Sequence, residues 1–183
     1  MNPMIHTDLG NSIDAIQELV DALDLSKETV NAAIAKAINR TMVSVRYQII
    51  RKVAADTNAK QKVIRRRTQL RKATSKRPSA SLSLYAYAIP LILFDWRESK
   101  SGITAGGRKY AGAFQRADVE RMRGKNRDMI LERKGKSRYP LFERRVAILE
   151  ESVNAFEISE KDVIDFFTKN LVHELRFRGG LFE

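Results

Sequence analysis

The feature that most restricts the fold of this 183-residue chain is a stretch from Ser26 to about Asp56 with neither glycine nor proline. Its apolar residues recur every three or four positions, which is the period of an amphipathic helix. Ser26 and Glu28 suit the first turn, where a hydroxyl caps backbone amides and a carboxylate meets the positive end of the helix dipole. Such a helix would span roughly 45 Å at the usual rise per residue. That length predicts a helix that projects or packs along a neighbouring subunit.

Two further helices are expected beside this one. Ser12 to Asp24 places isoleucine, leucine and valine on one helical face, within an N-terminal helical region over residues 1–25. Asn58 is predicted to end the long helix. Lys60 to Ala73 then has few large apolar residues and seven basic ones, so we expect a basic helix there. Residues 26–73 are therefore interpreted as long and basic helices.

Strand character follows in residues 79–147. Ser79 to Pro90 alternates small or polar residues with larger apolar ones, at a period close to two. Further short strands are expected over Leu91–Trp96, Tyr110–Ala117 and Asp128–Arg133. Glu98 to Lys109 is rich in glycine and is interpreted as a mobile loop that orders on assembly. The residues assigned to this assembly loop are Gly102, Gly106, Gly107, Arg108 and Lys109.

The C-terminal segment, residues 148–178, is predicted to be helical. One helix is expected from Val146 to Phe156 and a second, amphipathic one from Ser159 to Phe177, ended by the glycines that follow. The order of helices, then strands, then helix indicates an α+β fold with a small antiparallel sheet. We predict one structural domain over residues 1–183.

Charge is distributed unevenly along the chain. The net charge is +12, with −5 in residues 1–35, +13 in 36–78, +8 in 79–145 and −4 in 146–183. The basic middle suits a polyanion, for which nucleic acid is the default. Alternatively, the acidic ends of one subunit meet the basic middle of the next in a homo-oligomer. The residues expected to contact DNA or a partner are Lys60, Lys62, Arg65, Arg66, Arg67, Arg71, Lys72, Lys76, Arg77, Arg121, Arg123, Lys125 and Arg127.

The sequence offers little for catalysis. It has no cysteine, which excludes disulfides and thiolate metal sites, and only two histidines. No motif of a hydrolase, a zinc protease or a phosphate-binding loop occurs. Asp118, Asp128 and Glu132 are the least unsuitable carboxylates for a metal-dependent nuclease, which is a weaker alternative. We expect no catalytic residue, cofactor or metal. The longest apolar run, Tyr85 to Phe94, is also too short to cross a membrane.

An ordered set of short motifs carries a family resemblance. They are Ala37-Ile-Asn-Arg40, Val63-Ile-Arg-Arg-Arg67, Leu70-Arg-Lys-Ala-Thr74, Gly112-Ala-Phe114 and Gly135-Lys-Ser-Arg-Tyr-Pro140. Together they cover roughly residues 35–142. In this order they resemble the phage minor tail protein Z family of lambda-like tails.

The resemblance implies a non-enzymatic protein that completes the tail at its head-proximal end. It implies an α+β fold like that of tail-completion and neck proteins, with a small sheet flanked by helices. The implied partners are tail-terminator and tail-tube proteins, further copies of the chain in a possible ring, and DNA near the head–tail joint. The implied location is the virion tail, assembled in the host bacterial cytoplasm. A sequence-tolerant phage DNA-binding protein is the alternative reading.

Overall fold

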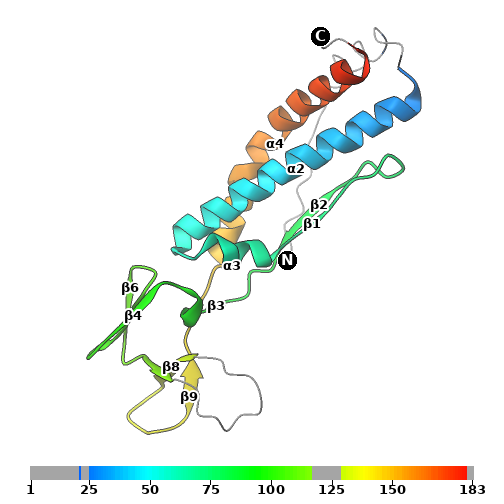
Figure 1. Ribbon diagram of the computed structural model, residues 1–183. Helices are drawn as coiled ribbons and strands as arrows, with labels where there is room; N and C mark the ends of the chain where they lie inside the picture. The colour runs from blue at the N-terminus through cyan, green and yellow to red at the C-terminus, as the bar shows by residue number, and fades with distance from the viewer. Residues whose placement is uncertain (1–20, 22–24, 117–128, 181–183) are drawn as a thin grey trace. The chain divides into compact units, whose positions relative to one another are not determined.

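A computed structural model describes residues 21, 25–116 and 129–180 of the chain (Figure 1). The chain forms two compact units. The first contains Met1–Ile50, Thr68–Leu84 and Val153–Glu183, and the second contains Arg51–Arg67 and Tyr85–Ser152. The helix expected over Ser12–Asp24 lies, apart from Asp21, outside the described residues.

The long helix α2, Lys27–Thr57, confirms the prediction from the uninterrupted pattern. At its start, the Thr29 amide donates to Ser26 Oγ at 3.3 Å. At its end, Asn58 adopts a left-handed conformation with φ +53°. The Asn58 N–H donates to the Ala55 carbonyl, and the Ala59 N–H donates to the Ala54 carbonyl. This pair of hydrogen bonds is the Schellman motif. Asn58 therefore ends the helix, as predicted.

In the first unit, α2 packs against helix α4, Leu149–Arg178. Two alanines of α2, Ala33 and Ala37, meet Leu171 and Leu175 in one buried cluster. The small alanine side chains let the leucines approach the α2 backbone closely. The amphipathic helix predicted over Ser159–Phe177 therefore contributes two of its apolar residues to this core.

The expectation of two separate C-terminal helices is wrong, because α4 is continuous. Ser159, predicted to cap the second helix, lies inside α4 and is buried. The segment from Leu149 to Arg178 contains no glycine or proline, so nothing interrupts its backbone hydrogen bonds. The end is as predicted: the Gly179 amide bonds Leu175 O at 2.9 Å, and Gly180 has φ +71°.

The helix expected over Lys60–Ala73 is wrong beyond Arg66. Helix α3 covers only Gln61–Arg66, and strand β1, Thr68–Arg71, follows it. In β1 the buried Thr68 and half-buried Leu70 alternate with exposed neighbours, which is a strand period. Strand β2, Ser81–Leu84, pairs with β1 in an antiparallel hairpin with Thr68 opposite Leu84. The hairpin supplies backbone partners that favour a strand over a second helix.

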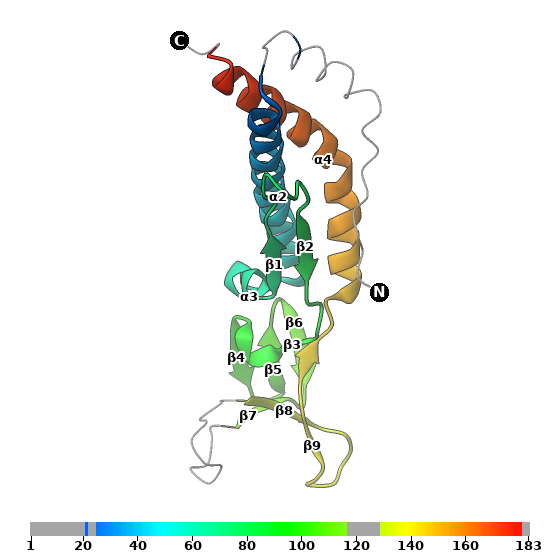
Figure 2. The ribbon, with the colours of Figure 1, turned by 90° about the vertical axis from the view of Figure 1, so that its right-hand side faces the viewer.

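Among the described residues, the second unit holds three small antiparallel sheets, ordered β4-β5-β6, β7-β8-β9 and β10-β3 (Figure 2). The strands are β3 Ile89–Pro90, β4 Trp96–Ser99, β5 Gly102–Ala105, β6 Arg108–Ala111, β7 Phe114–Arg116, β8 Met129–Arg133, β9 Leu141–Glu143 and β10 Arg145–Val146. The strand expected over Asp128–Arg133 is confirmed as β8. The one expected over Leu91–Trp96 is wrong, because Leu91–Leu93 forms a 3-10 turn.

The Gly-rich segment is not an irregular loop, so that part of its prediction is wrong. It forms the meander β4-β5-β6, joined by tight turns. Gly106 and Gly107, with φ +54° and +73°, make the two-residue turn between β5 and β6. A side chain at Gly102, where φ is +135°, would lie 2.2 Å from the Tyr110 carbonyl oxygen. Glycine here supports a regular sheet, and a part in assembly stays a prediction.

The fold class is confirmed as α+β, with a long early helix, small antiparallel sheets and a C-terminal helix. Among the described residues, no helix combines the length and apolarity needed to cross a membrane.

Candidate functional site

The fold divides the predicted basic set between the two units. Lys60 to Arg67 belong to the second unit, whereas Arg71 to Arg77 belong to the hairpin of the first. The remaining members, Arg121, Arg123, Lys125 and Arg127, lie outside the described residues. The described members of the predicted set therefore come from both units, and their contact with DNA or a partner stays a prediction.

The basic tip of the hairpin, defined as Arg71, Lys72, Lys76 and Arg77, is exposed at all four residues. Within the part of the chain that the structure describes, none of the four forms an ion pair. Four like charges this close remain favourable only while water or an anionic partner solvates them.

The backbone of the basic tip is fixed on α2. The side-chain Nδ2 of Asn39 donates to the backbone oxygen of Ala73 at 3.0 Å, and Asn39 Oδ1 accepts from the backbone N–H of Ala73 at 2.8 Å. Lower on the hairpin, Arg46 donates to Thr68 O at 3.2 Å. Thr74 and Arg77 form two backbone hydrogen bonds with each other, and these close the turn. The cations are therefore presented on a constrained hairpin.

The basic residues of the second unit play mixed parts. Lys60 Nζ lies 2.7 Å from Asp95, so its charge is already paired. Lys62 and Arg66 are exposed on α3. Arg67 is half-buried and donates to the Tyr87 carbonyl. Burial, and then the Arg145 guanidinium, lower the pKa of Arg67. Arg67 therefore holds the fold, rather than standing free for a ligand.

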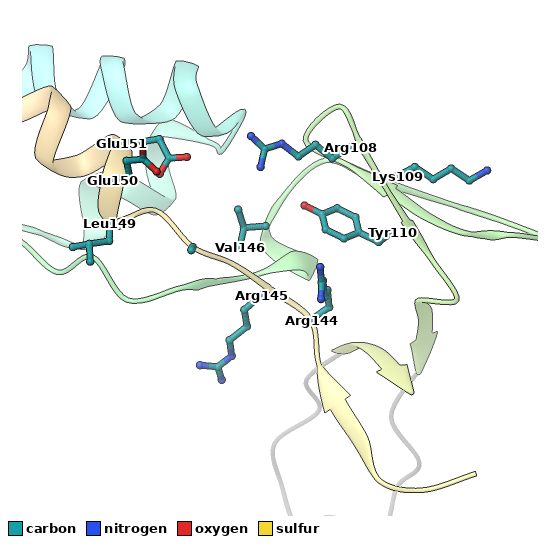
Figure 3. A pocket seen from close by; sticks show the side chains of 10 residues that line it. Arg108, Lys109, Tyr110, Arg144, Arg145, Val146, Leu149, Glu150 and Glu151 are labelled. Carbon is teal, nitrogen blue, oxygen red and sulfur yellow. The ribbon is translucent and has the colours of Figure 1, made fainter. Parts of the chain in front are cut away.

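A cleft of about 760 Å³ lies in the second unit (Figure 3). Arg108, Lys109 and Tyr110 of β6 line one wall, and Glu150 and Glu151 at the start of α4 line another. Figure 3 shows Arg108 facing the two glutamates and Lys109 turned away from them. Opposite charges across one open cleft suit a polypeptide that carries both signs.

Two arginines missed by the sequence reasoning complete this cleft. Arg144 lies over the Tyr110 ring at 5.3 Å and 3.0 Å from Glu132, and Arg145 lies 2.6 Å from Glu143. Both charges are therefore already paired. The sequence carries no signal for this cleft, since its walls come from segments more than thirty residues apart.

Of the three carboxylates of the nuclease alternative, the described residues include one. Glu132 of the weaker nuclease reading is paired with an arginine, and Asp118 and Asp128 lie outside the described residues. No group of three potential metal ligands occurs among the residues described.

A buried carboxylate, also missed by the sequence reasoning, joins the two long helices. Glu174 of α4 is 1% exposed. Lys36 Nζ lies 3.1 Å from its Oε2, and Arg40 Nη1 lies 2.5 Å from its Oε1. Nearby, Asn170 Nδ2 donates to Thr41 Oγ1 at 3.0 Å. These contacts fix the register of α4 on α2.

Comparison with known proteins gives two matches that agree. The family described as prophage minor tail protein Z (GPZ) matches residues 13–179. The chain is also similar to the tail completion protein Z of Escherichia phage lambda, with 26% identity over 166 residues. That alignment covers 80% of this chain and 84% of the lambda protein. No solved structure matches.

Proposed function

Because the chain belongs to the prophage minor tail protein Z family, a family of structural, non-enzymatic phage tail proteins, we propose that it completes the tail at its head-proximal end. It does so by binding tail-terminator and tail-tube proteins and further copies of itself. Assembly takes place in the host bacterial cytoplasm, and the protein remains in the virion tail.

The observation that carries this proposal is the extent of the family match. Residues 13–179 include nearly all of both compact units. A relative aligned over 84% of its own length bears the name tail completion protein. The constrained basic tip and the two-sign cleft support a role in binding proteins, since charge pairing across an interface fixes register and partner choice.

The test is a phage that carries this gene with an early stop codon. We expect tails of normal length that fail to give infectious particles, and recovery of infectivity when purified protein is added to the tails. An antibody label on completed virions should lie at the head–tail joint. Full infectivity without the protein, or a label at the distal tip, would contradict the proposal.

Contact with DNA is the second candidate. It rests on the exposed cations alone, chiefly the basic tip with Lys62 and Arg66. A protein that neutralises several phosphates binds duplex DNA with an affinity that falls steeply as salt rises. Gel shift across a salt series, with specific and random duplexes, measures this. A DNA affinity that does not change with salt concentration would contradict this candidate. A preference for the specific duplex over the random one would favour a regulator.

A further inference from the structure

The first unit carries an anionic surface that matches the basic tip in size. The acidic face, defined as Glu157, Asp162 and Asp165 of α4, is exposed at each residue. Ile158 beside it is 53% exposed. Asp162 accepts a hydrogen bond from Gln48 at 3.5 Å. Among the residues described, no lysine or arginine pairs with these three carboxylates.

The two charged surfaces have similar dimensions. Eight residues separate the ends of the acidic face, which is about 12 Å along a helix. Arg71 ends β1, and Arg77 pairs with Thr74, which lies three residues further on, at most about 10 Å in an extended chain. Lysine and arginine side chains extend this cluster further. The tip therefore covers about the length of the acidic face.

One copy of the chain cannot bring its own tip and acidic face together. Asn39 of α2 holds the hairpin, whereas Thr41 contacts α4. Two residues along a helix are about 200° apart around its axis. The hairpin and α4 therefore lie on opposite sides of α2, as Figure 1 shows. Among the described residues, each surface therefore stays without its complement in a single copy.

We propose that the basic tip of one copy docks on the acidic face of a second copy. This inference rests on the self-association included in the proposed function and assigns its contact. Because the two surfaces differ, the contact is heterologous, and a pair of copies keeps one free tip and one free face. Repetition of such a contact closes a ring or extends a filament. Ile158 provides an apolar contact within the charged surface.

The test reverses each surface and then mixes the variants. Arg71→Glu with Lys72→Glu makes a tip-reversed chain, and Asp162→Lys with Asp165→Lys makes a face-reversed chain. Each alone should associate with itself at least roughly tenfold more weakly than the unmodified chain in sedimentation experiments. An equal mixture of the two should associate again, because the tip that has gained two carboxylates meets the face that has gained two lysines, and the unmodified tip meets the unmodified face.

A matched control has the same charge change on another surface. Lys62→Glu with Arg66→Glu on α3 should leave self-association unchanged. Circular dichroism checks that every variant is folded, and Arg71→Gln with Lys72→Gln replaces the reversal if it unfolds the hairpin. An unmodified chain that stays monomeric at its highest soluble concentration overturns the contact, as does a mixture that fails to associate.

Other outcomes separate this contact from its alternatives. If tip reversal abolishes DNA binding but leaves self-association intact, the tip faces DNA and the proposal is wrong. If the mixture behaves as expected but infectivity does not depend on the protein, the proposed function fails and the contact stands. If infectivity depends on the protein but charge reversal changes no association, only the contact fails.

Discussion

The buried carboxylate between α2 and α4 gives an asymmetric prediction. Replacing Glu174 with glutamine should cost less stability than replacing both of its cationic partners, Lys36 and Arg40, with alanine. The reason is burial: the carboxylate is 1% exposed, whereas the side chains of the lysine and arginine are 47% and 43% exposed. Water can solvate the cations when the carboxylate is gone, but it cannot reach the carboxylate when the cations are gone.

The two magnitudes follow from that difference. Glu174→Gln keeps the shape and some hydrogen bonding but loses charge assistance, which costs about 1.5–3 kcal/mol. The Lys36→Ala and Arg40→Ala pair leaves a desolvated charge without compensation, which costs about 3–5 kcal/mol. A third variant adds Glu174→Leu to the pair. It should recover most of the lost stability, because no buried charge remains.

The measurement is urea unfolding followed by circular dichroism, with thermal melts beside it. In a chain of this size about 1 kcal/mol moves the melting temperature by about 2–4 °C. Lys52→Ala is the control, since it breaks an exposed pair with Asp56 and should cost under about 1 kcal/mol. If Glu174→Gln costs as much as the double alanine variant, desolvation of the carboxylate does not govern this contact.

Three further predictions follow from the backbone and the core. Gly102→Ala should destabilise the β4-β5-β6 sheet strongly, seen as faster trypsin cleavage. The control is Gly112→Ala, at φ +73° with no atom within 4 Å of the added carbon, which should cost only about 1–3 kcal/mol. Equal destabilisation by the two substitutions would exclude the clash with Tyr110. Asn58→Val should lower the free energy of unfolding by about 1–2 kcal/mol in urea and Asn58→Gly should not, because only valine resists the left-handed conformation. Leu175→Ala, at a fully buried site, should cost about 2–5 kcal/mol and exceed the cost of Phe166→Ala at a half-buried one; the reverse order in urea titrations would contradict the assigned core.

The parts of the fold that were predicted are those with local signals at both ends. Helix α2 begins at a hydroxyl cap and ends at Asn58, and both signals lie in adjacent residues. Strand β8 has its own apolar run. The family was also predictable from the ordered short motifs. A match of residue identities does not depend on the secondary structure predicted for them, which was wrong for Leu70 to Thr74.

The parts that were missed depend on partners distant in sequence. Strand β1 was assigned to a helix because its basic residues suit either state, and the pairing with β2 decides between them. Glycines that support the tight meander looked the same as glycines of a loop. Glu174 carries no signal of burial, since its partners come from a helix more than 130 residues earlier. The division of the basic set between two units also depends on tertiary contacts.

The clamp of Asn39 on the hairpin has a consequence for solubility. A two-stranded sheet has two open edges, and an open edge invites strands from other molecules. At the start of β1 and just beyond its end, Arg46 and Asn39 bond backbone groups of Thr68 and Ala73 that would otherwise be available to such a strand. The long helix thus shields one edge of the hairpin from aggregation, and leaves side chains as the means by which this edge can recognise another protein.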